Sequence, residues 1–266
     1  MRQQVVLKGV SAGYANRTVL SQLAVRVPAF ATTAVVGPNG SGKSTLLGVM
    51  AGVIPVTAGT VEHRTGRRAA FVVQRSEAAD MLPLTVRDAV AMGRWGRRGL
   101  CRRLSRQDWA VVDASVDRLG ISALARRQLG ELSGGQRQRA LVAQGLAQEA
   151  DLLLLDEPTT GLDATAQRLI ADVLDEVAAE GGTVVQATHD LEAARAVGHV
   201  LMLQEGRLFA SGAPGAVLTD SAIERIWHLS PAGVKGARRG PEAGETEGAS
   251  AAFARPWLGS AATRER

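Results

Sequence analysis

A nine-residue glycine-rich segment constrains this chain more than any other feature of its sequence. Residues 37–45 read GPNGSGKST and fit the pattern G-x-x-x-x-G-K-[ST]. The apolar run 32–36 before it is typical of a strand, and the run 45–51 after it is helix-like. Glycines let the backbone fold around phosphate oxygens with its N–H groups pointing inward, and a helix N-terminus adds positive potential. The segment is therefore predicted to bind phosphate.

Two side chains of this loop are predicted to do chemistry. Lys43 should reach the β- and γ-phosphates of a nucleotide, and the hydroxyl of Ser44 should bind Mg²⁺. The alternative is a glycine-rich turn with a chance lysine, which the flanking strand and helix disfavour. The predicted nucleotide-binding residues of the loop are Gly37, Pro38, Asn39, Gly40, Ser41, Gly42, Lys43, Ser44 and Thr45.

A pair of carboxylates forms the second motif. The apolar run 152–155 is typical of a strand buried on both faces, and it ends at Asp156 and Glu157. Asp156 is predicted to lie beside a bound Mg²⁺, directly or through water, and Glu157 to orient and polarise an attacking water. A strand that merely ends at polar residues is the alternative. Together with the phosphate loop, the pair predicts phosphoryl-transfer chemistry on a nucleotide with Mg²⁺, which small GTPases share although they place the two motifs much closer in sequence.

A third motif ends the long segment between the first two. The sequence LSGGQ at residues 132–136 precedes a helix-like run, 137–147. Bare N–H groups at a helix N-terminus form an anion site. One nucleotide needs only one phosphate cradle, so a second one suggests a nucleotide held by a partner, with two copies paired head to tail. An ordinary helix cap with glycines is the alternative. The residues assigned to this second site are Ser133, Gly134, Gly135 and Gln136.

The rest of the chain alternates short apolar runs with amphipathic stretches, which predicts an α/β fold. The clearest helix is 164–179, with Asp163 as its cap and Gly181-Gly182 at its end. Residues from about 76 to 145 are predicted to form an inserted helical subdomain. Domain boundaries are predicted at 1–229 for a nucleotide-binding domain and at 230–266 for a flexible, Gly-, Ala- and Glu-rich tail. The predicted strands are 5–10, 20–27, 32–36, 69–73, 152–155, 183–187, 200–203 and 208–210.

Composition narrows the setting. The longest apolar candidate for a membrane span, 19–36, contains Arg26 and Pro28, and the N-terminus lacks the core of a signal peptide. A single cysteine excludes an intrachain disulfide, so the chain is expected in the cytoplasm. The net charge of +5 suggests an anionic partner, whereas 3% aromatic residues disfavour single-stranded nucleic acid.

These motifs in this order resemble the ATP-binding subunit of ATP-binding cassette (ABC) transporters, over about residues 5–219. The resemblance implies a P-loop core, an antiparallel β edge subdomain and an inserted α-helical subdomain. It implies that Tyr14 stacks on adenine, that Gln74 touches Mg²⁺ or the attacking water, and that Asp163 couples two sites. It also implies that His189 contacts the γ-phosphate. Each of these four also has an ordinary reading, as a loop polar residue, a structural histidine or a core tyrosine.

The resemblance also implies partners. These are a second copy of the chain, integral membrane permease subunits and, indirectly, a periplasmic or surface solute-binding protein. Nucleic acid is not an expected partner. The chain would be a cytoplasmic protein that lies on the inner face of the cell membrane. Segments 84–88, 91–96, 127–136 and 147–151 resemble the zinc and manganese importers, with zinc preferred. Importers of iron-siderophore, haem or cobalamin, a non-transport ABC ATPase and an exporter's ATPase subunit remain alternatives.

Two features stay outside these motifs. The four histidines, His63, His189, His199 and His228, have no ligand spacing, so any selectivity for a transition metal should lie in other subunits. An arginine-rich segment, 94–106, is predicted to be a solvated surface or else to contact lipid head groups or the permease.

Overall fold

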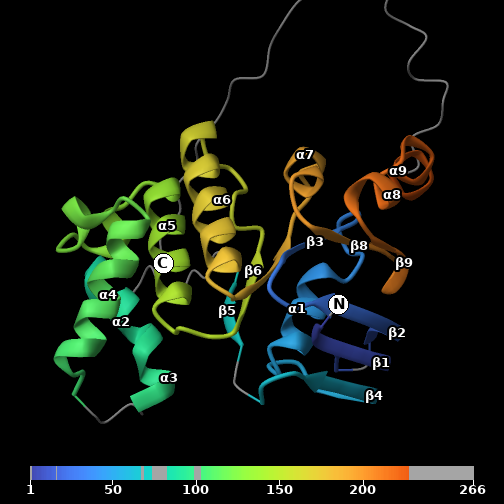
Figure 1. Cartoon of the computed structure of the whole chain (residues 1–266), viewed down its shortest axis with the longest axis horizontal. Coiled ribbons are helices and arrows are strands. Elements are labelled where there is room, and N and C mark those ends of the chain that lie inside the picture. The colour runs from blue at the N-terminus through green and yellow to red at the C-terminus, as the bar shows by residue number, and fades with distance from the viewer. Residues whose placement is uncertain (1, 16, 67–68, 74–82, 99–102, 228–266) are drawn as a thin grey trace, which may run out of the picture. The chain divides into compact units, whose positions relative to one another are not determined.

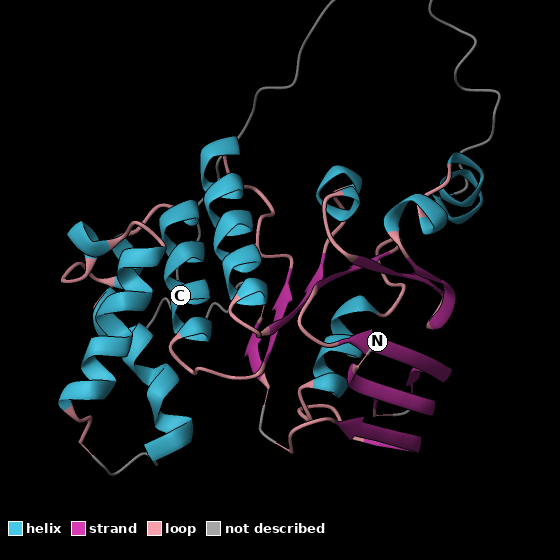
Figure 2. Cartoon of the chain, in the orientation of Figure 1, coloured by secondary structure: helices cyan, strands magenta, loops and turns pink. Residues whose placement is uncertain are grey.

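A six-stranded sheet forms the centre of the fold (Figures 1 and 2). The computed structural model describes residues 2–15, 17–66, 69–73, 83–98 and 103–227. The strand order is β5-β6-β7-β3-β8-β9, in which the first five are parallel and β9 pairs antiparallel with β8. The strands are β3 (Thr32–Val36), β5 (Ala70–Val72), β6 (Leu152–Asp156), β7 (Thr183–Ala187), β8 (His199–Gln204) and β9 (Arg207–Gly212). The predicted α/β core with its parallel sheet is confirmed.

A separate antiparallel sheet has the order β2-β1-β4. Its strands are β1 (Gln3–Tyr14), β2 (Arg17–Pro28) and β4 (Val56–His63). The sequence predicted the first two strands but not β4. All eight residues of β4 are exposed or only partly buried, so the strand has no apolar face that alternation could reveal.

The helical subdomain lies between β5 and β6 and occupies the left of Figure 1. Within its described part, residues 83–98 and 103–151, the backbone is helix, turn and loop with one isolated bridge, between Thr85 and Gln128. The predicted inserted helical subdomain is therefore confirmed, although residues 76–82 lie outside the described chain. Its helices are α2 (Val86–Ala91), η2 (Met92–Arg94), α3 (Trp95–Arg98), α4 (Arg106–Arg118), η3 (Ser122–Leu124), η4 (Leu129–Glu131) and α5 (Gly134–Leu146).

The remaining helices are α1 (Lys43–Met50), α6 (Ala164–Ala179), α7 (Leu191–Arg195), α8 (Pro214–Val217) and α9 (Asp220–Trp227). The structure places α6 at the predicted bounds, and the carboxylate of Asp163 accepts a hydrogen bond from the N–H of Ala166 at 2.8 Å. This cap satisfies one of the free N–H groups of the first turn. Gly181 follows with φ +93°, a left-handed conformation that suits glycine at a helix end.

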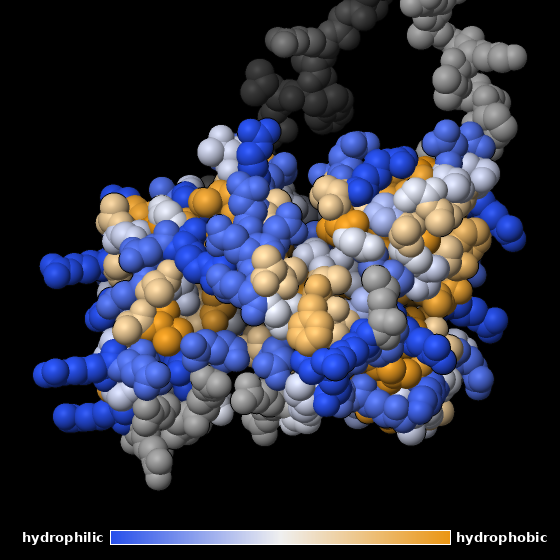
Figure 3. All heavy atoms as spheres, in the orientation of Figure 1, coloured by the Kyte–Doolittle hydropathy of each residue, from blue (hydrophilic) through white to orange (hydrophobic). Residues whose placement is uncertain are grey.

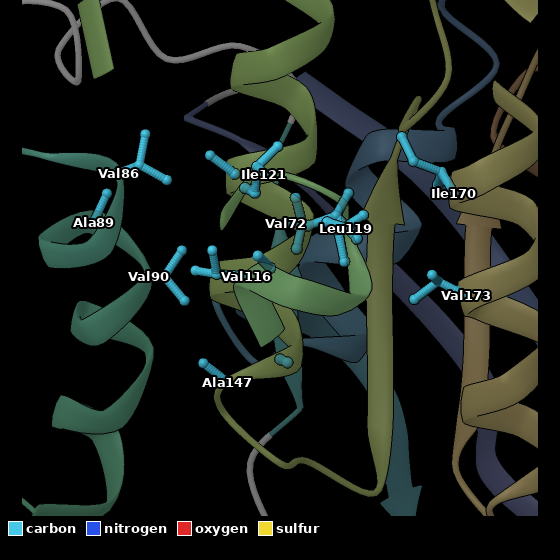
Figure 4. Packing of buried hydrophobic residues seen from close by; sticks show 14 of the residues in the cluster. Val72, Val86, Ala89, Val90, Val116, Leu119, Ile121, Ala147, Ile170 and Val173 are labelled. Carbon is cyan, nitrogen blue, oxygen red and sulfur yellow. The ribbon is translucent and has the colours of Figure 1, made fainter. Parts of the chain in front are cut away.

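Successive side chains of β3 and β8 belong alternately to two separate hydrophobic clusters. Val35 and Leu201 pack with α1 and the antiparallel sheet, whereas Val36 and Met202 pack with α7, α8 and α9. Successive side chains of a strand point to opposite faces, so the two clusters cover opposite faces of the central sheet. A third cluster joins the helical subdomain to α6; Figure 4 shows Val90 of α2 facing Val116 of α4, with Ile170 and Val173 of α6 beyond Leu119.

The prediction of a solvated arginine-rich surface is wrong for Arg94. This side chain is buried, with 5% of its surface exposed, and it forms an ion pair with Asp108, which is 1% exposed. Its Nη1 also donates to the carbonyl of Ala147 and to Glu149 Oε2, both at 2.8 Å. A guanidinium can be buried where its donors are all engaged. Arg103 and Arg106 are exposed as predicted, whereas the side chains of Arg97, Arg98 and Arg102 lie outside the described set.

The face drawn in Figure 3 is mainly hydrophilic, with apolar areas scattered between the hydrophilic side chains. Among the described residues, no helix combines the length and the apolar character that a membrane crossing requires.

Candidate nucleotide site

The phosphate loop connects the carboxyl end of β3 to the N-terminus of α1, as the sequence predicted. Gly40 and Gly42 have φ values of +78° and +101°, in a region that residues other than glycine rarely occupy. A Cβ on Gly42 would approach Leu20 Cδ2 to 2.8 Å, and one on Gly37 would approach the carbonyl oxygen of Leu203 to 2.3 Å. The glycines therefore let this loop pack tightly against β2 and β8.

Lys43 is folded over its own loop. Its Nζ donates to the carbonyl oxygens of Gly37 at 2.8 Å and Pro38 at 3.1 Å. Burial lowers the pKa of Lys43, while the nearby charges of Glu157 and Asp156 act in the opposite direction. A buried ammonium group beside a phosphate-binding backbone is suited to hold the anionic end of a nucleotide.

Asp156 ends β6 beside this loop. Burial raises the pKa of Asp156, and the neighbouring charge of Glu157 raises it further, whereas a hydrogen bond with Ser44 and the charge of Lys43 lower it. Its Oδ1 is one of the buried side-chain atoms that have no hydrogen-bond partner in the described chain. An unpartnered carboxylate oxygen next to the Ser44 hydroxyl offers the oxygen ligands that Mg²⁺ prefers. The residues present thus fit the predicted Mg²⁺ site.

Glu157 has a left-handed backbone, with φ +50°. Such a conformation is uncommon for a residue other than glycine and is found preferentially at functional sites. Its N–H donates to the carbonyl of Ala187 at 3.0 Å, which joins the ends of β6 and β7. Its Oε2 accepts a hydrogen bond from Thr160 Oγ1 at 3.0 Å and lies 3.7 Å from Nδ1 of His189. The predicted water-orienting carboxylate and the predicted γ-phosphate histidine are therefore neighbours.

Tyr14 lies in the open rather than in the core, with 55% of its surface exposed. The core alternative for this tyrosine is therefore wrong. It lines a cleft of about 1230 Å³ that also contains the phosphate loop, Glu157 and His189. Four further residues at this cleft were not predicted, because they belong to none of the motifs; they are Arg17, Val19, Thr160 and Trp227. Gln74 lies outside the described residues.

The third motif does not line this cleft. Ser133 forms a capping box at the start of α5: its Oγ accepts from the N–H of Gln136 at 3.3 Å, and its own N–H donates to Gln136 Oε1 at 3.1 Å. Gly134, Gly135 and Asp163 are absent from the cleft's lining as well. The helix-cap reading of the motif is thus observed, and its N–H groups are not used by the nucleotide cleft of the same chain.

A phosphate loop between strand and helix, with a carboxylate pair ending an adjacent parallel strand, defines a P-loop nucleoside triphosphatase. The family model described as "ABC transporter" matches residues 20–160. The chain belongs to the ABC transporter family, and it is an ABC-type ATPase of the kind that binds and hydrolyses ATP in transporters.

Similar proteins have informative names. A "Probable metal transport system ATP-binding protein" of Chlamydia trachomatis is 38% identical over 221 residues, which cover 79% of this chain and 83% of that protein. The "Zinc transport system ATP-binding protein TroB" of Treponema pallidum is 34% identical over 229 residues, covering 84% and 86%. The "Ferric enterobactin transport ATP-binding protein FepC" of Escherichia coli is 38% identical over 230 residues, covering 82% and 84%.

Solved structures agree with the fold. A structure of a metal-chelate type ABC transporter in an inward-facing conformation has a TM-score of 0.77 and 30% identity, covering 85% of this chain and 90% of that one. An ATP-binding cassette in its ADP conformation has a TM-score of 0.74 over 86% of this chain and 100% of the other. Its 21% identity supports the fold alone.

Proposed function

We propose that this chain is the ATP-hydrolysing subunit of an importer for a divalent transition metal, with zinc as the first candidate and manganese as the second. The observation that carries the proposal is the set of relatives. A zinc transport protein and a "Manganese transport system ATP-binding protein MntB" of Bacillus subtilis are each 34% identical to it over most of its length. The chain would work on the inner face of the cell membrane with separate permease subunits and, indirectly, a solute-binding protein.

An importer of an iron chelate is the alternative to an importer of a divalent transition metal. It is favoured by the 38% identity to the ferric enterobactin protein and by the likeness to a metal-chelate type transporter. The chain's own residues do not choose between these cargoes, because the described residues contain no group of three His, Cys, Asp or Glu side chains able to hold a metal ion. Selectivity is accordingly assigned to the permease and the solute-binding protein.

The proposed ATPase cycle uses the residues of the cleft. Tyr14 stacks on adenine, and the backbone of residues 37–45 with Lys43 binds the phosphates. Glu157 orients a water for attack on the γ-phosphorus and takes up its proton, and the products are ADP and phosphate. His189, beside Glu157, contacts the γ-phosphate. A Mg²⁺ ion held by Ser44, Asp156 and Gln74 would neutralise charge on the β- and γ-phosphates.

A second copy would complete each site. Ser133, Gly134, Gly135 and Gln136 of one chain would contact the γ-phosphate bound to Lys43 of the other, and Asp163 would couple the two sites. The proposal is supported by the position of this motif, which begins a 13-residue helix outside the chain's own cleft. ATP would then close the pair, and hydrolysis would release it.

Growth of a deletion strain tests the cargo. On medium depleted of metals by a chelator, the strain should grow poorly, and added zinc should restore growth at lower concentrations than manganese or an iron chelate. A gene for the wild-type chain should restore growth without added metal, and one carrying Glu157→Gln should not. Rescue by an iron-siderophore alone would mean that the cargo is an iron chelate rather than zinc. Normal growth under every depletion would refute metal import.

A further inference from the structure

Trp227 lies at the nucleotide cleft, although it is about 180 residues from the phosphate loop in the chain. It is the last residue of α9 and lines the large cleft together with Tyr14 and Lys43. It also lines a smaller adjoining cavity of about 250 Å³ with Pro38 and Asn39 of the phosphate loop. Trp227 thus lines both the large cleft and the smaller cavity, which also share Pro38 and Asn39 of the phosphate loop.

The two aromatic residues reach the cleft from opposite faces of the central sheet. Tyr14 belongs to the antiparallel sheet, which packs with Val35 and Leu201. Trp227 packs with the cluster that contains Val36 and Met202, on the other face. Figure 1 shows α9 and the β1–β2 pair on opposite sides of β8. A nucleotide in the cleft would therefore lie between the side chains of two separate layers.

The end of α9 packs against the core of the domain. Ile226, its neighbour in the chain, is fully buried in the same cluster. The guanidinium of Arg225 lies 5.5 Å from the ring centre of Phe209 on β9. Trp227 itself is only partly buried, and it is one of the residues that line the cleft.

We propose that Trp227 is a second aromatic nucleotide-contacting residue, opposite Tyr14. An indole has an apolar face and one N–H donor. A nucleotide presents a purine, a ribose and phosphate oxygens, so a ring in the wall of its cleft has a matching partner. The inference rests on the nucleotide occupying this cleft and adds a residue that none of the three motifs contains.

Fluorescence of a single indole tests the contact. In a variant whose only tryptophan is Trp227 (Trp95→Phe, Trp109→Phe and Trp257→Phe together), saturating Mg-ADP should change the emission. The matched variant Trp227→Phe, which keeps the other three tryptophans, should show no such change. The change should be independent of protein concentration. A signal that appears only as concentration rises would mean that Trp227 contacts a second chain, and it would overturn the proposal, as would an unchanged emission while ADP is bound.

Binding measured by calorimetry gives the second test. Trp227→Ala should weaken ATP binding by at least about fivefold, since aromatic contacts to a base contribute about 1–3 kcal/mol. Trp227→Phe should recover most of the affinity. Trp109→Phe is the control, because Trp109 packs against Arg87 in the helical subdomain. Equal affinity in wild type and Trp227→Ala would overturn this inference alone, whereas failure of the wild type to bind ATP would overturn the proposed function.

Should Trp227→Ala unfold, a pair of milder variants still tests the proposal, since Trp227→Phe and Trp227→Leu keep an apolar side chain against the cluster that contains Val36 and Met202. Thermal melting without nucleotide reports the packing role. If the two variants melt alike, Trp227→Leu should bind ATP several times more weakly than Trp227→Phe. Equal binding by these two variants would contradict a role for an aromatic ring at this position.

Discussion

Glu157 Oε2 lies 3.7 Å from Nδ1 of His189, at the ends of two neighbouring strands, β6 and β7. The link between Glu157 N–H and the Ala187 carbonyl holds the two strand ends together. This relationship places the proposed general base and the proposed γ-phosphate contact side by side in the cleft. Glu157 combines a left-handed backbone with a carboxylate that lies beside Thr160 and His189.

Replacing Glu157 by glutamine should abolish turnover and preserve binding. The amide has nearly the same shape but cannot take up the proton of the attacking water, so the rate of ATP hydrolysis should fall by at least about 100-fold. Phosphate release measures the rate, and calorimetry measures the retained affinity for ATP. Glu192→Gln, at a side chain 88% exposed beyond the cleft, is the matched control and should hydrolyse ATP normally. Unchanged turnover in Glu157→Gln would exclude the role as a base.

Replacing Lys43 by alanine should weaken ATP binding by at least about tenfold, because charge-assisted hydrogen bonds contribute about 1.5–3 kcal/mol. Equilibrium binding of labelled ATP provides the measurement. Lys8→Ala removes another lysine, one that pairs with Glu62 on the exposed part of the antiparallel sheet, and it should bind ATP like the wild type. Wild-type affinity in Lys43→Ala would show that the loop has been misread.

Asp156 should make the free protein less stable as pH rises. Because its pKa is raised in the folded state, chiefly by burial, the folded chain binds this proton more tightly than the unfolded chain does. Its contribution therefore favours folding at pH values below the unfolded pKa and is lost as pH rises through the folded pKa. Asp156→Asn should melt at a higher temperature than wild type at neutral pH without nucleotide or Mg²⁺, and the gap should narrow on acidification.

The same variant should lose the stabilisation that Mg²⁺ adds to ATP, if Asp156 helps to hold the ion. Melting curves with ATP, with and without Mg²⁺, measure this difference. A Mg²⁺-dependent rise in the variant that equals or exceeds the rise in wild type would refute the assignment of Asp156. A melting gap that widens on acidification would refute its pH dependence.

The ion pair of Arg94 and Asp108 should matter far more for folding than the exposed pair of Arg87 and Asp113. Removing one partner of a buried pair costs about 3–5 kcal/mol, so Arg94→Leu should lower the free energy of unfolding by that amount. Arg87→Leu breaks an exposed pair and should cost about 1 kcal/mol or less. Urea denaturation of both variants measures the difference. Equal losses would mean that Arg94 is not held as the structure describes.

The sequence predicted those parts of the fold in which local pattern and burial agree. Buried parallel strands appear as short apolar runs, and α6 has both its apolar stripe and its capping Asp163 in the sequence. The exposed strand β4 lacked any such pattern, because its pairing with β1 comes from backbone hydrogen bonds that side chains do not encode.

The residues of the site could be predicted where they lie close together in the sequence, within a local motif. Residues 37–45 form one continuous motif and Asp156–Glu157 form another, so the spacing within each motif was enough to identify it. Trp227 and the burial of Arg94 depend on side chains brought together from distant segments, and no local spacing carries that information. The left-handed backbone of Glu157 also arises from tertiary contacts rather than from its neighbours in the chain.

The proposed ATPase cycle depends most on a site that a second copy of the chain completes. The formation of this dimer can be measured directly. Glu157→Gln with Mg-ATP should elute as a dimer in size-exclusion chromatography with light scattering, and as a monomer with Mg-ADP. Adding Ser133→Arg should leave ATP binding intact and keep the chain monomeric, since Ser133 lies outside the chain's own cleft. A double variant that still forms the ATP-dependent dimer, or Glu157→Gln that stays monomeric with ATP bound, would contradict the account.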